Sequence, residues 1–458
     1  MDISFRLNGE LVSLTDVDPT RSVLDFLRED KGLTGTKEGC NEGDCGACSA
    51  LVGDAGGVRA QNTCLMMLGH LDGRALVTVE GLAAPDGTPH PVQQALVDHH
   101  GSQCGFCTPG FAVTLAAGHL SSDHDIKTLL GGNLCRCTGY APILRAAEAA
   151  ATETSPPHLK DALEAPRPDA SKEAGPACPG AVDALATLYA DHPEATLIGG
   201  ATEVALDVNK ALKDLPFPIF LGQVREFDKI EITEDKITFG AGASIETLRR
   251  IMAGHHPGFA EMLTRFGSAQ VRAAGTIGGN VANGSPIAET PPPLIALGAE
   301  LHLRHRDARR NLPLEQYYVA YGQQDRRDGE FIEAVSIPRQ KDRLRSYKIA
   351  RRFDQDICTV LGAFNIHVNV GKVLSARIAF GGMAGVVKRA EAVERALIGR
   401  PWTRETVAAA LDAFETDFAP ISDLRAGADY RREVARNLLL RYWHEDQGTP
   451  VAVMGVTP

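Results

Sequence analysis

The sequence has no excess of positive charge, no long apolar run and no export signal. Its 458 residues carry a formal net charge of −11, which argues against a nucleic-acid-binding surface, because such a surface needs a concentrated positive field. No run reaches the 18 apolar residues expected of a membrane-spanning helix. The first residues, MDISFRLNGE, contain neither a charged n-region nor an apolar h-region, so we expect no signal peptide and a cytoplasmic protein.

Cysteine is concentrated in the first third of the chain. Eight of the ten cysteines precede residue 138, which suits either a disulfide framework or metal sites. Because a reducing compartment disfavours disulfides, metal sites are the better interpretation. The other two, Cys178 and Cys358, have no partner pattern, and we expect Cys358 to be a small buried apolar residue.

Changes in periodicity predict several domains. Residues 1–14 alternate around Asn8-Gly9, which indicates a β-hairpin, and residues 20–31 indicate a short amphipathic helix capped by Thr20. Helical spacing dominates residues 90–150, and a stretch rich in proline, alanine and charge follows it. The predicted segments are an α+β domain at 1–80, a helical domain at 81–155, a linker at 156–178, a strand-and-helix domain at 179–345 and a C-terminal domain of strands then helices at 346–458.

The first cysteine set has the spacing of a plant-type ferredoxin. Cys40, Cys45, Cys48 and Cys64 follow the pattern C-x4-C-x2-C and then a more distant cysteine, which is typical of a [2Fe–2S] cluster. Glycines between the ligands allow the loop to wrap tightly and turn backbone N–H groups toward the sulfurs. A structural zinc is the main alternative, although zinc sites usually use two C-x2-C knuckles.

The second cysteine set has a less common spacing. Cys104 and Cys107 stand in SQCGFCTPG, and Cys135 and Cys137 stand in GNLCRCTGY. Two thiolates separated by one residue can reach one metal site if the chain turns at the start of a helix, and the proline and glycine residues after each pair provide such turns. A helix N-terminus also favours anionic thiolates.

These two motifs, following a plant-type set, resemble the molybdenum hydroxylase family, which includes xanthine dehydrogenases and aldehyde oxidases. The resemblance implies a multidomain α+β fold with a β-grasp ferredoxin-like domain and a four-helix domain that holds a second [2Fe–2S] cluster. It also implies a flavin-binding domain related to vanillyl-alcohol oxidase and a C-terminal α+β domain. Gln103, beside Cys104, would then face the pterin of a molybdenum cofactor held on a partner subunit.

Two glycine-rich turns are candidates for binding a dinucleotide. LIGGATEVALDV at 197–208 and GTIGGNVANGSPIAETPPPL at 275–294 could present backbone N–H groups to a pyrophosphate, although neither has the G-x-G-x-x-G pattern of Rossmann folds. A tight loop that needs positive φ is the alternative for either turn alone.

Both turns resemble the FAD-binding segments of the same family. The residues that this resemblance assigns to the first side of FAD are Leu197, Ile198, Gly199, Gly200, Ala201, Thr202, Glu203 and Val204. Those assigned to its second side are Phe266, Thr276, Gly279, Asn280, Ser285 and Glu289, with Ile332 and Lys348 near the ring. Phe266 should stack on the flavin, and Tyr321 should lie where nicotinamide approaches. Core packing is the alternative role for both aromatic residues.

The resemblance implies an electron-transfer function. Clusters carry single electrons, NAD⁺ accepts a pair as hydride, and FAD can exchange electrons singly or in pairs. The sequence stops soon after the flavin region, so we expect the molybdenum cofactor on a separate large subunit, in a heterotetramer with two copies of each chain. No catalytic residue for purine hydroxylation is expected in this chain.

The order of iron–sulfur and FAD domains in one chain resembles bacterial xanthine dehydrogenases. It implies that the partner hydroxylates hypoxanthine and xanthine to urate while this chain delivers the electrons to NAD⁺. The alternatives are an equivalent subunit for aldehyde, CO or N-heterocycle substrates, electron delivery to O₂, and a non-catalytic iron–sulfur scaffold.

Overall fold

Alternating apolar residues at the N-terminus form the first strand of a mixed sheet. β1 (Ile3–Leu7) buries its first, third and fifth residues. Asn8 and Gly9 have positive φ values of 49° and 90° in the turn to antiparallel β2 (Glu10–Leu14), so the predicted hairpin is confirmed. β3 (Ser49–Asp54), β4 (Gly57–Asn62) and β5 (Ala75–Val77) complete the order β2-β1-β5-β3-β4, in which β1 and β5 run parallel.

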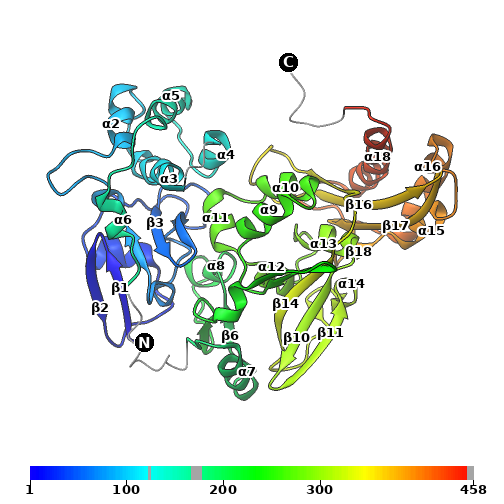
Figure 1. The fold of residues 1–458 in the computed structure, drawn as a ribbon, viewed down its shortest axis with the longest axis horizontal. Helices are drawn as coiled ribbons and strands as arrows, with labels where there is room; N and C mark the ends of the chain where they lie inside the picture. Colours follow the sequence, from blue (N-terminus) through cyan, green and yellow to red (C-terminus); the bar gives the residue numbers. More distant parts are fainter. Residues whose placement is uncertain (122–124, 167–177, 451–458) are drawn as a thin grey trace. The chain divides into compact units, whose positions relative to one another are not determined.

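The computed structural model describes residues 1–121, 125–166 and 178–450 (Figure 1). These residues fall into two compact units. The first unit is Met1–Leu188, Glu194–Arg225 and Gly267–Gly275, and the second is Tyr189–Pro193, Glu226–Phe266 and Thr276–Pro458. Among the described residues, no helix has both the length and the apolar character needed to cross a bilayer.

The predicted helix at 20–31 is present, but its start differs from the prediction. Ser22, not Thr20, caps α1 (Val23–Asp25), because the Ser22 hydroxyl accepts a hydrogen bond from the Asp25 N–H at 3.0 Å. Thr20 instead donates its hydroxyl to Asp18. The chain continues as a π-helical turn at Phe26–Asp30, and Phe26 and Leu27 enter the core behind the sheet.

Four helices follow the sheet, as the helical spacing predicted. They are α2 (Pro91–Asp98), α3 (Thr108–Ser121), α4 (Ile126–Leu130) and α5 (Ala141–Ala150). α3 is buried over most of its length and packs against β3 (Figure 1). The segment predicted as a linker begins with α6 (His158–Ala162), whose Leu159 and Ala162 pack into this helical core. Residues 167–177 of that prediction lie outside the described residues.

The first unit also contains part of the predicted flavin-binding region. Parallel strands β6 (Thr196–Ile198) and β7 (Pro218–Phe220) flank α8 (Val204–Asn209), and α11 (Ala269–Ala274) packs against β4. α7 (Val182–Asp191) precedes these elements in the chain. The strand, glycine turn and helix predicted at 197–208 are therefore present.

The second unit contains a five-stranded antiparallel sheet in the order β11-β10-β14-β9-β8. Its strands are β8 (Ile230–Ile232), β9 (Lys236–Gly240), β10 (Glu300–His305), β11 (Ala308–Pro313) and β14 (Phe331–Pro338). The helices of this region are α9 (Ile245–Ala253), α10 (Pro257–Thr264), α12 (Ile277–Ala282), α13 (Pro291–Leu297) and α14 (Leu314–Tyr317). A short hairpin joins β12 (Tyr318–Ala320) to β13 (Gln323–Gln324).

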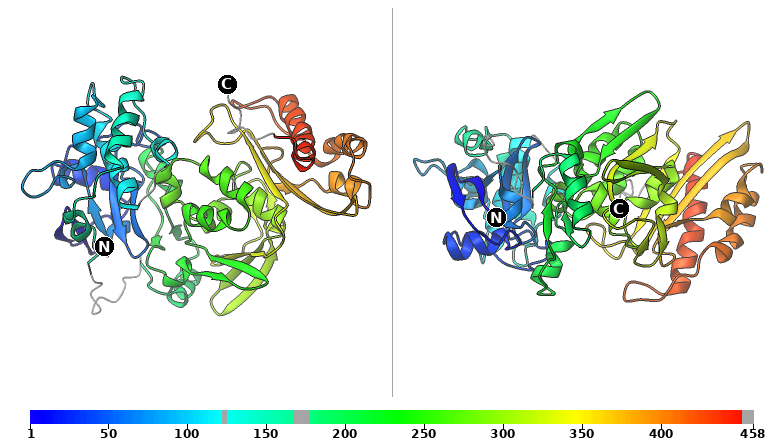
Figure 2. Two further views of the ribbon diagram at one scale, coloured as in Figure 1. Left: turned by 45° about the horizontal axis from the view of Figure 1, so that its top comes forward. Right: turned by 90° about the horizontal axis from the view of Figure 1, so that it is seen from below.

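The last region has strands followed by helices, as predicted. β15 (Leu344–Ile349), β16 (Val360–Asn369), β17 (Lys372–Gly381) and β18 (Lys388–Arg389) form a sheet in chain order. The helices are α15 (Glu391–Leu397), α16 (Arg404–Ala410), α17 (Phe414–Asp417) and α18 (Ala428–Asp446). In Figure 2 these orange and red helices lie along the long strands, and they enclose an aromatic core that includes Phe364, Phe380 and Tyr442.

Candidate iron–sulfur and flavin sites

The first four cysteines form two thiol pairs in the ferredoxin-like domain. Cys40 and Cys45 share a hydrogen bond between their thiols, and Cys48 Sγ lies 3.3 Å from Cys64 Sγ. Cys48 and Cys64 are buried, whereas Cys40 and Cys45 are partly exposed. The hydrogen bond from the Cys45 thiol outweighs burial and, with backbone N–H groups, lowers the pKa of the Cys40 thiol to about 5.

Backbone N–H groups surround the Cys40 sulfur, as expected for a glycine-rich ligand loop. The N–H groups of Glu42, Asp44 and Cys45 donate to Cys40 Sγ at 3.4, 3.3 and 3.4 Å. Gly43 has a φ of 84°, a backbone conformation that residues other than glycine rarely adopt. Such donors stabilise negative charge on sulfur, so the loop fits a cluster that takes up an electron.

The second cysteine set also forms two thiol pairs, Cys104 with Cys137 and Cys107 with Cys135. Cys107 directly precedes α3, and the other motif precedes α5. Burial, and next the Cys135 thiol, raise the pKa of Cys107 to about 12. The Cys135 N–H donates to the Tyr140 hydroxyl at 3.0 Å, which fixes the turn between the motif and the helix.

The paired arrangement fits binuclear clusters. Each iron of a [2Fe–2S] cluster binds two bridging sulfides and therefore needs two protein thiolates. A structural zinc needs four ligands around one point. The two thiol pairs of each set therefore fit one [2Fe–2S] cluster per set.

The two cysteine sets are joined by direct contacts inside the first unit. The Leu134 N–H donates to the Cys45 carbonyl at 3.0 Å, and Asn133 Nδ2 donates to the Gly46 carbonyl at 3.2 Å. A Cβ atom on Gly110 would lie 2.2 Å from the Gly46 carbonyl oxygen, so only glycine allows α3 to approach this loop so closely. Cys45 of the first set is thus hydrogen-bonded to Leu134, the residue directly before Cys135 of the second set.

A buried amide connects α11 to both iron–sulfur domains. Gln270 is 1% exposed, and its Nε2 lies 3.0 Å from Asn133 Oδ1, 3.0 Å from Thr114 Oγ1 and 3.4 Å from Ser49 Oγ. Ser49 follows Cys48 in the chain, and Asn133 lies two residues before Cys135. Gln270 therefore holds the loops of the two cysteine sets in one hydrogen-bond network.

The first glycine turn is bonded to the ferredoxin-like domain. A Cβ atom on Gly200 would lie 1.7 Å from the Ala274 carbonyl oxygen, so this position accepts only glycine. His70 Nδ1 accepts from the Met67 N–H at 3.2 Å, so Nε2 carries the proton and donates to the Gly199 carbonyl at 2.8 Å. Burial, and then the charge of Arg74, lower the pKa of His70 to about 4, which keeps this ring neutral. Residues 197–204 all belong to β6, this turn and the start of α8.

The second glycine turn lies in the second unit, around α12. Thr276 caps this helix, because its hydroxyl accepts the Gly279 N–H at 3.0 Å. Asn280 Oδ1 accepts the N–H and hydroxyl of Thr290 at 3.3 and 2.6 Å. These side chains fix the backbone of their own turn, and Gly279 remains exposed.

The structure brings Glu289 and Lys348 together as a buried ion pair. Lys348 Nζ lies 2.8 Å from the Glu289 carboxylate, and both side chains are almost fully buried. The Cys358 N–H donates to the same carboxylate at 3.0 Å, and Lys348 Nζ also donates to the Arg265 carbonyl at 2.7 Å. Burial raises the pKa of the Glu289 carboxyl, and the Lys348 ammonium opposes that shift. Cys358 is fully buried, as predicted.

The remaining predicted site residues come from separate elements of the chain. Phe266 is partly buried directly after α10, Ser285 accepts from the Ile287 N–H at 3.3 Å, and Ile332 is buried in β14. Tyr321 is 78% exposed at the tip of the β12–β13 hairpin. Gln103, in the first unit, is exposed beside Cys104.

Sequence reasoning missed four residues that organise these sites: His70, Gln270, Asn209 and Lys210. Asn209 Nδ2 donates to the Cys64 carbonyl, and Lys210 Nζ donates to the Cys40 carbonyl, both at 2.6 Å. All four residues bond segments more than a hundred positions away in the chain. A polar residue inside or after a helix carries no local signal for such a contact.

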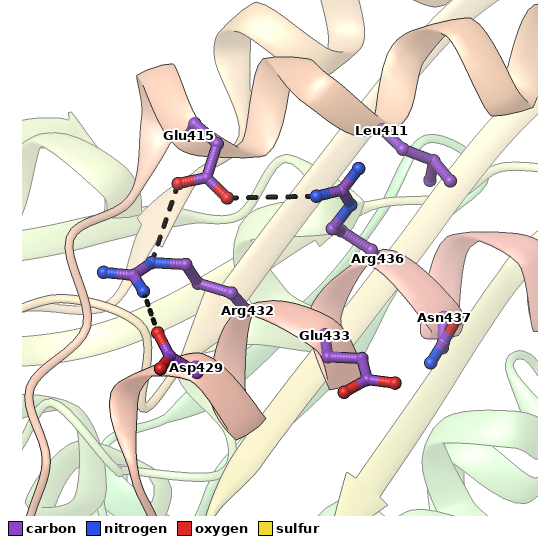
Figure 3. A pocket seen from close by; sticks show the side chains of 7 residues that line it. All are labelled: Leu411, Glu415, Asp429, Arg432, Glu433, Arg436 and Asn437. Carbon is purple, nitrogen blue, oxygen red and sulfur yellow. Dashed lines mark hydrogen bonds and ion pairs between the residues drawn. The ribbon is translucent and has the colours of Figure 1, made fainter.

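The C-terminal helices line a separate polar pocket of about 340 Å³. Its two arginines, Arg432 and Arg436, flank Glu415 at 3.6 and 4.0 Å, and Arg432 also pairs with Asp429 at 2.5 Å (Figure 3). The arginines are thus already neutralised by carboxylates, and none of the predicted cofactor residues lines this pocket.

Four domain families match the chain in sequence. They are a 2Fe-2S iron-sulfur cluster binding domain at residues 5–68, a [2Fe-2S] binding domain at 78–148, an FAD binding domain in molybdopterin dehydrogenase at 172–340, and a CO dehydrogenase flavoprotein C-terminal domain at 345–446. This is the domain series of the iron–sulfur and FAD part of molybdenum hydroxylases. The predicted cofactor types, two [2Fe–2S] clusters and FAD, are confirmed by these matches.

Curated relatives match almost the whole chain. Xanthine dehydrogenase of Emericella nidulans is 29% identical over 97% of this chain and 38% of its own length. Nicotinate hydroxylase hnxS of the same organism is 28% identical over 96% of this chain and 40% of its own length. The chain therefore spans about two fifths of these relatives.

Solved structures of the family resemble part of the fold. A carbon monoxide dehydrogenase from Hydrogenophaga pseudoflava, which lacks the Mo-pyranopterin moiety of the molybdenum cofactor, has 27% identity and a TM-score of 0.55 over 58% of this chain and 93% of that chain. Quinoline 2-oxidoreductase from Pseudomonas putida 86, at 24% identity and a TM-score of 0.54 over 59% of this chain and 96% of that chain, shows the fold alone. The four domains of this chain match those of the iron–sulfur and FAD electron-transfer part of molybdenum hydroxylases.

Proposed function

We propose that this chain passes electrons from a molybdenum–pterin partner subunit to NAD⁺, as the electron-transfer part of a cytoplasmic xanthine dehydrogenase. When bound, the two clusters carry single electrons and FAD converts them to a hydride for NAD⁺. Cys40, Cys45, Cys48 and Cys64 would hold one cluster. Cys104, Cys107, Cys135 and Cys137 would hold the other, and the residues that the resemblance assigns to FAD are the proposed flavin contacts.

The observation that carries this proposal is the continuous bonding of three candidate sites within the first unit. Leu134 links the second cysteine set to Cys45, and His70 links the first set's domain to Gly199 in the glycine turn. Electron transfer needs carriers at fixed, short separations, and such hydrogen bonds hold their protein ligands in place. In this order the plant-type set stands between the second set and the flavin turn.

The exposure of the second cysteine set supports the presence of a partner there. Cys104 and Cys137 are exposed, and the neighbouring Phe106 and Leu134 are each 48% exposed. Apolar side chains beside exposed metal ligands are suited to burial at an interface. A molybdenum subunit at this face would be the electron source, in a heterotetramer with two copies of each chain.

The substrate depends on the partner. The xanthine dehydrogenase relative supports purine hydroxylation. The nicotinate hydroxylase relative, at nearly equal identity, makes an N-heterocycle the second candidate. The exposed Tyr321 supports an accessible acceptor site, at which we propose NAD⁺.

Substitution of Cys135 by serine in the complex with its partner tests the proposed order. We expect purine-driven NAD⁺ reduction to fall by about tenfold or more, because the second cluster loses a ligand. Dye reduction driven by NADH should persist, since that route needs only the flavin. Cys178→Ser, a buried cysteine outside both sets, is the matched control and should retain both activities. Loss of NADH-driven dye reduction in Cys135→Ser with FAD still bound would contradict the order.

A further inference from the structure

The end of α8 is bonded to the backbone of the plant-type cysteine set. Asn209 Nδ2 donates to the Cys64 carbonyl at 2.6 Å, and Lys210 Nζ donates to the Cys40 carbonyl at 2.6 Å. The Lys210 ammonium also lies 3.5 Å from the Glu42 carboxylate. All of these residues belong to the first unit.

The two carbonyls belong to different thiol pairs. Cys40 pairs with Cys45, and Cys64 pairs with Cys48. If each pair holds one iron, as two thiolates per iron require, the end of α8 contacts a ligand of each iron. Asn209 and Lys210 are consecutive in the chain, and each donates to a cysteine of a different thiol pair.

Donors at these positions should change the electronic properties of the cluster. A donor on a ligand's carbonyl, and a positive charge close to it, both favour the reduced cluster, which carries one more negative charge. Glu42 cancels part of the field of Lys210, but the ammonium lies closer to the Cys40 carbonyl than to this carboxylate. Removal of the ammonium is therefore expected to lower the reduction potential of the cluster.

The same segment begins at the glycine turn assigned to FAD. α8 begins at Val204, four positions after Gly200, and His70 fixes Gly199 to the ferredoxin-like domain. The segment from Gly199 to Lys210 is thus bonded to this domain at both of its ends.

We propose that Asn209 and Lys210 are positioning residues that set the reduction potential of the plant-type cluster and hold it against the flavin segment. This inference rests on the proposed function, because it requires a [2Fe–2S] cluster at the first cysteine set.

The test is a redox titration of the loaded full chain, in which the electron paramagnetic resonance signal of each cluster reports how much of it is reduced. At a fixed potential, Lys210→Gln should lower the ratio of reduced to oxidised plant-type cluster by about threefold, or about 28 mV, and Asn209→Ala should change it in the same direction. Lys210→Arg should retain the wild-type ratio. Lys213→Gln removes the same charge three residues after Lys210, where Lys213 pairs with Asp207, and is the matched control.

A second measurement covers variants that hold their cluster poorly. A chelator should remove iron from oxidised Lys210→Gln and Asn209→Ala faster than from Lys213→Gln, because the ligand loop has lost an anchor. Equal ratios and equal rates in all three variants would overturn the inference while leaving the proposed function intact. Absence of a plant-type cluster from the wild-type chain would instead overturn the proposed function.

Discussion

Truncation of Gln270 to alanine should destabilise the iron–sulfur domains by about 2–4 kcal/mol. Its Nε2 is the donor to Asn133 Oδ1, which is 1% exposed and would lose this partner at a cost of about 1–3 kcal/mol. Thr114 Oγ1 also loses this donor, but a hydroxyl can still donate its own hydrogen, so this loss costs less. The cavity left by the fully buried side chain adds about 1 kcal/mol.

Denaturant unfolding, followed by the visible absorbance of the clusters, measures this change directly. Gln270→Leu fills most of the cavity but still removes the donor, so it separates the hydrogen-bond contribution from the packing contribution. Gln94→Ala is the control, because this exposed glutamine on α2 bonds only the exposed Asp98 and should change stability by less than about 0.5 kcal/mol. If the free energy of unfolding of Gln270→Ala lies within about 0.5 kcal/mol of the wild-type value, the hydrogen bonds of Gln270 do not hold the two iron–sulfur domains together.

Three further changes test other contacts. Gly200→Ala should cost about 3 kcal/mol or more and reduce FAD content, because its Cβ would lie 1.7 Å from the Ala274 carbonyl oxygen; flavin per chain and unfolding midpoints measure this. Lys348→Met should destabilise the chain by about 3–5 kcal/mol, since Glu289 would stay buried without its partner, and this loss should shrink at low pH in a denaturant titration. The pKa of His70, about 4 in the folded chain, lies below its unfolded value, so its contribution is present above about pH 6.5 and is lost as pH falls toward 4. Unfolding at pH 5 should therefore show about 2 kcal/mol less stability from this ring than at pH 7, a difference that His70→Gln should remove.

The parts of the fold that the sequence predicted are those with local physical causes. Metal chemistry requires cysteines at short, characteristic spacings, so Cys40, Cys45 and Cys48 were identifiable in one loop. Asn8 and Gly9 specified their turn because few residue pairs accept positive φ at both positions. The same locality explains why the four helices between residues 90 and 150 were predicted.

The parts that the sequence did not predict depend on distant contacts. Asn209 and Cys64 are separated by 145 positions, and Gln270 and Asn133 by 137. Nothing in the residues around Asn209 or Gln270 distinguishes them from ordinary polar positions on a helix. The predicted cap of α1 was wrong for a more local reason. Thr20 and Ser22 are both good capping residues, and the sequence does not show that the Thr20 hydroxyl bonds Asp18 instead.

The most direct test of electron transfer through two clusters and FAD is the content of iron, acid-labile sulfide and FAD per purified chain. We expect about four irons, about four sulfides and one FAD per chain, because each cysteine set would hold one [2Fe–2S] cluster. Molybdenum should appear only when a second polypeptide is present. Zinc in place of iron, or a chain that binds no flavin, would contradict electron transfer and leave a cysteine-rich scaffold.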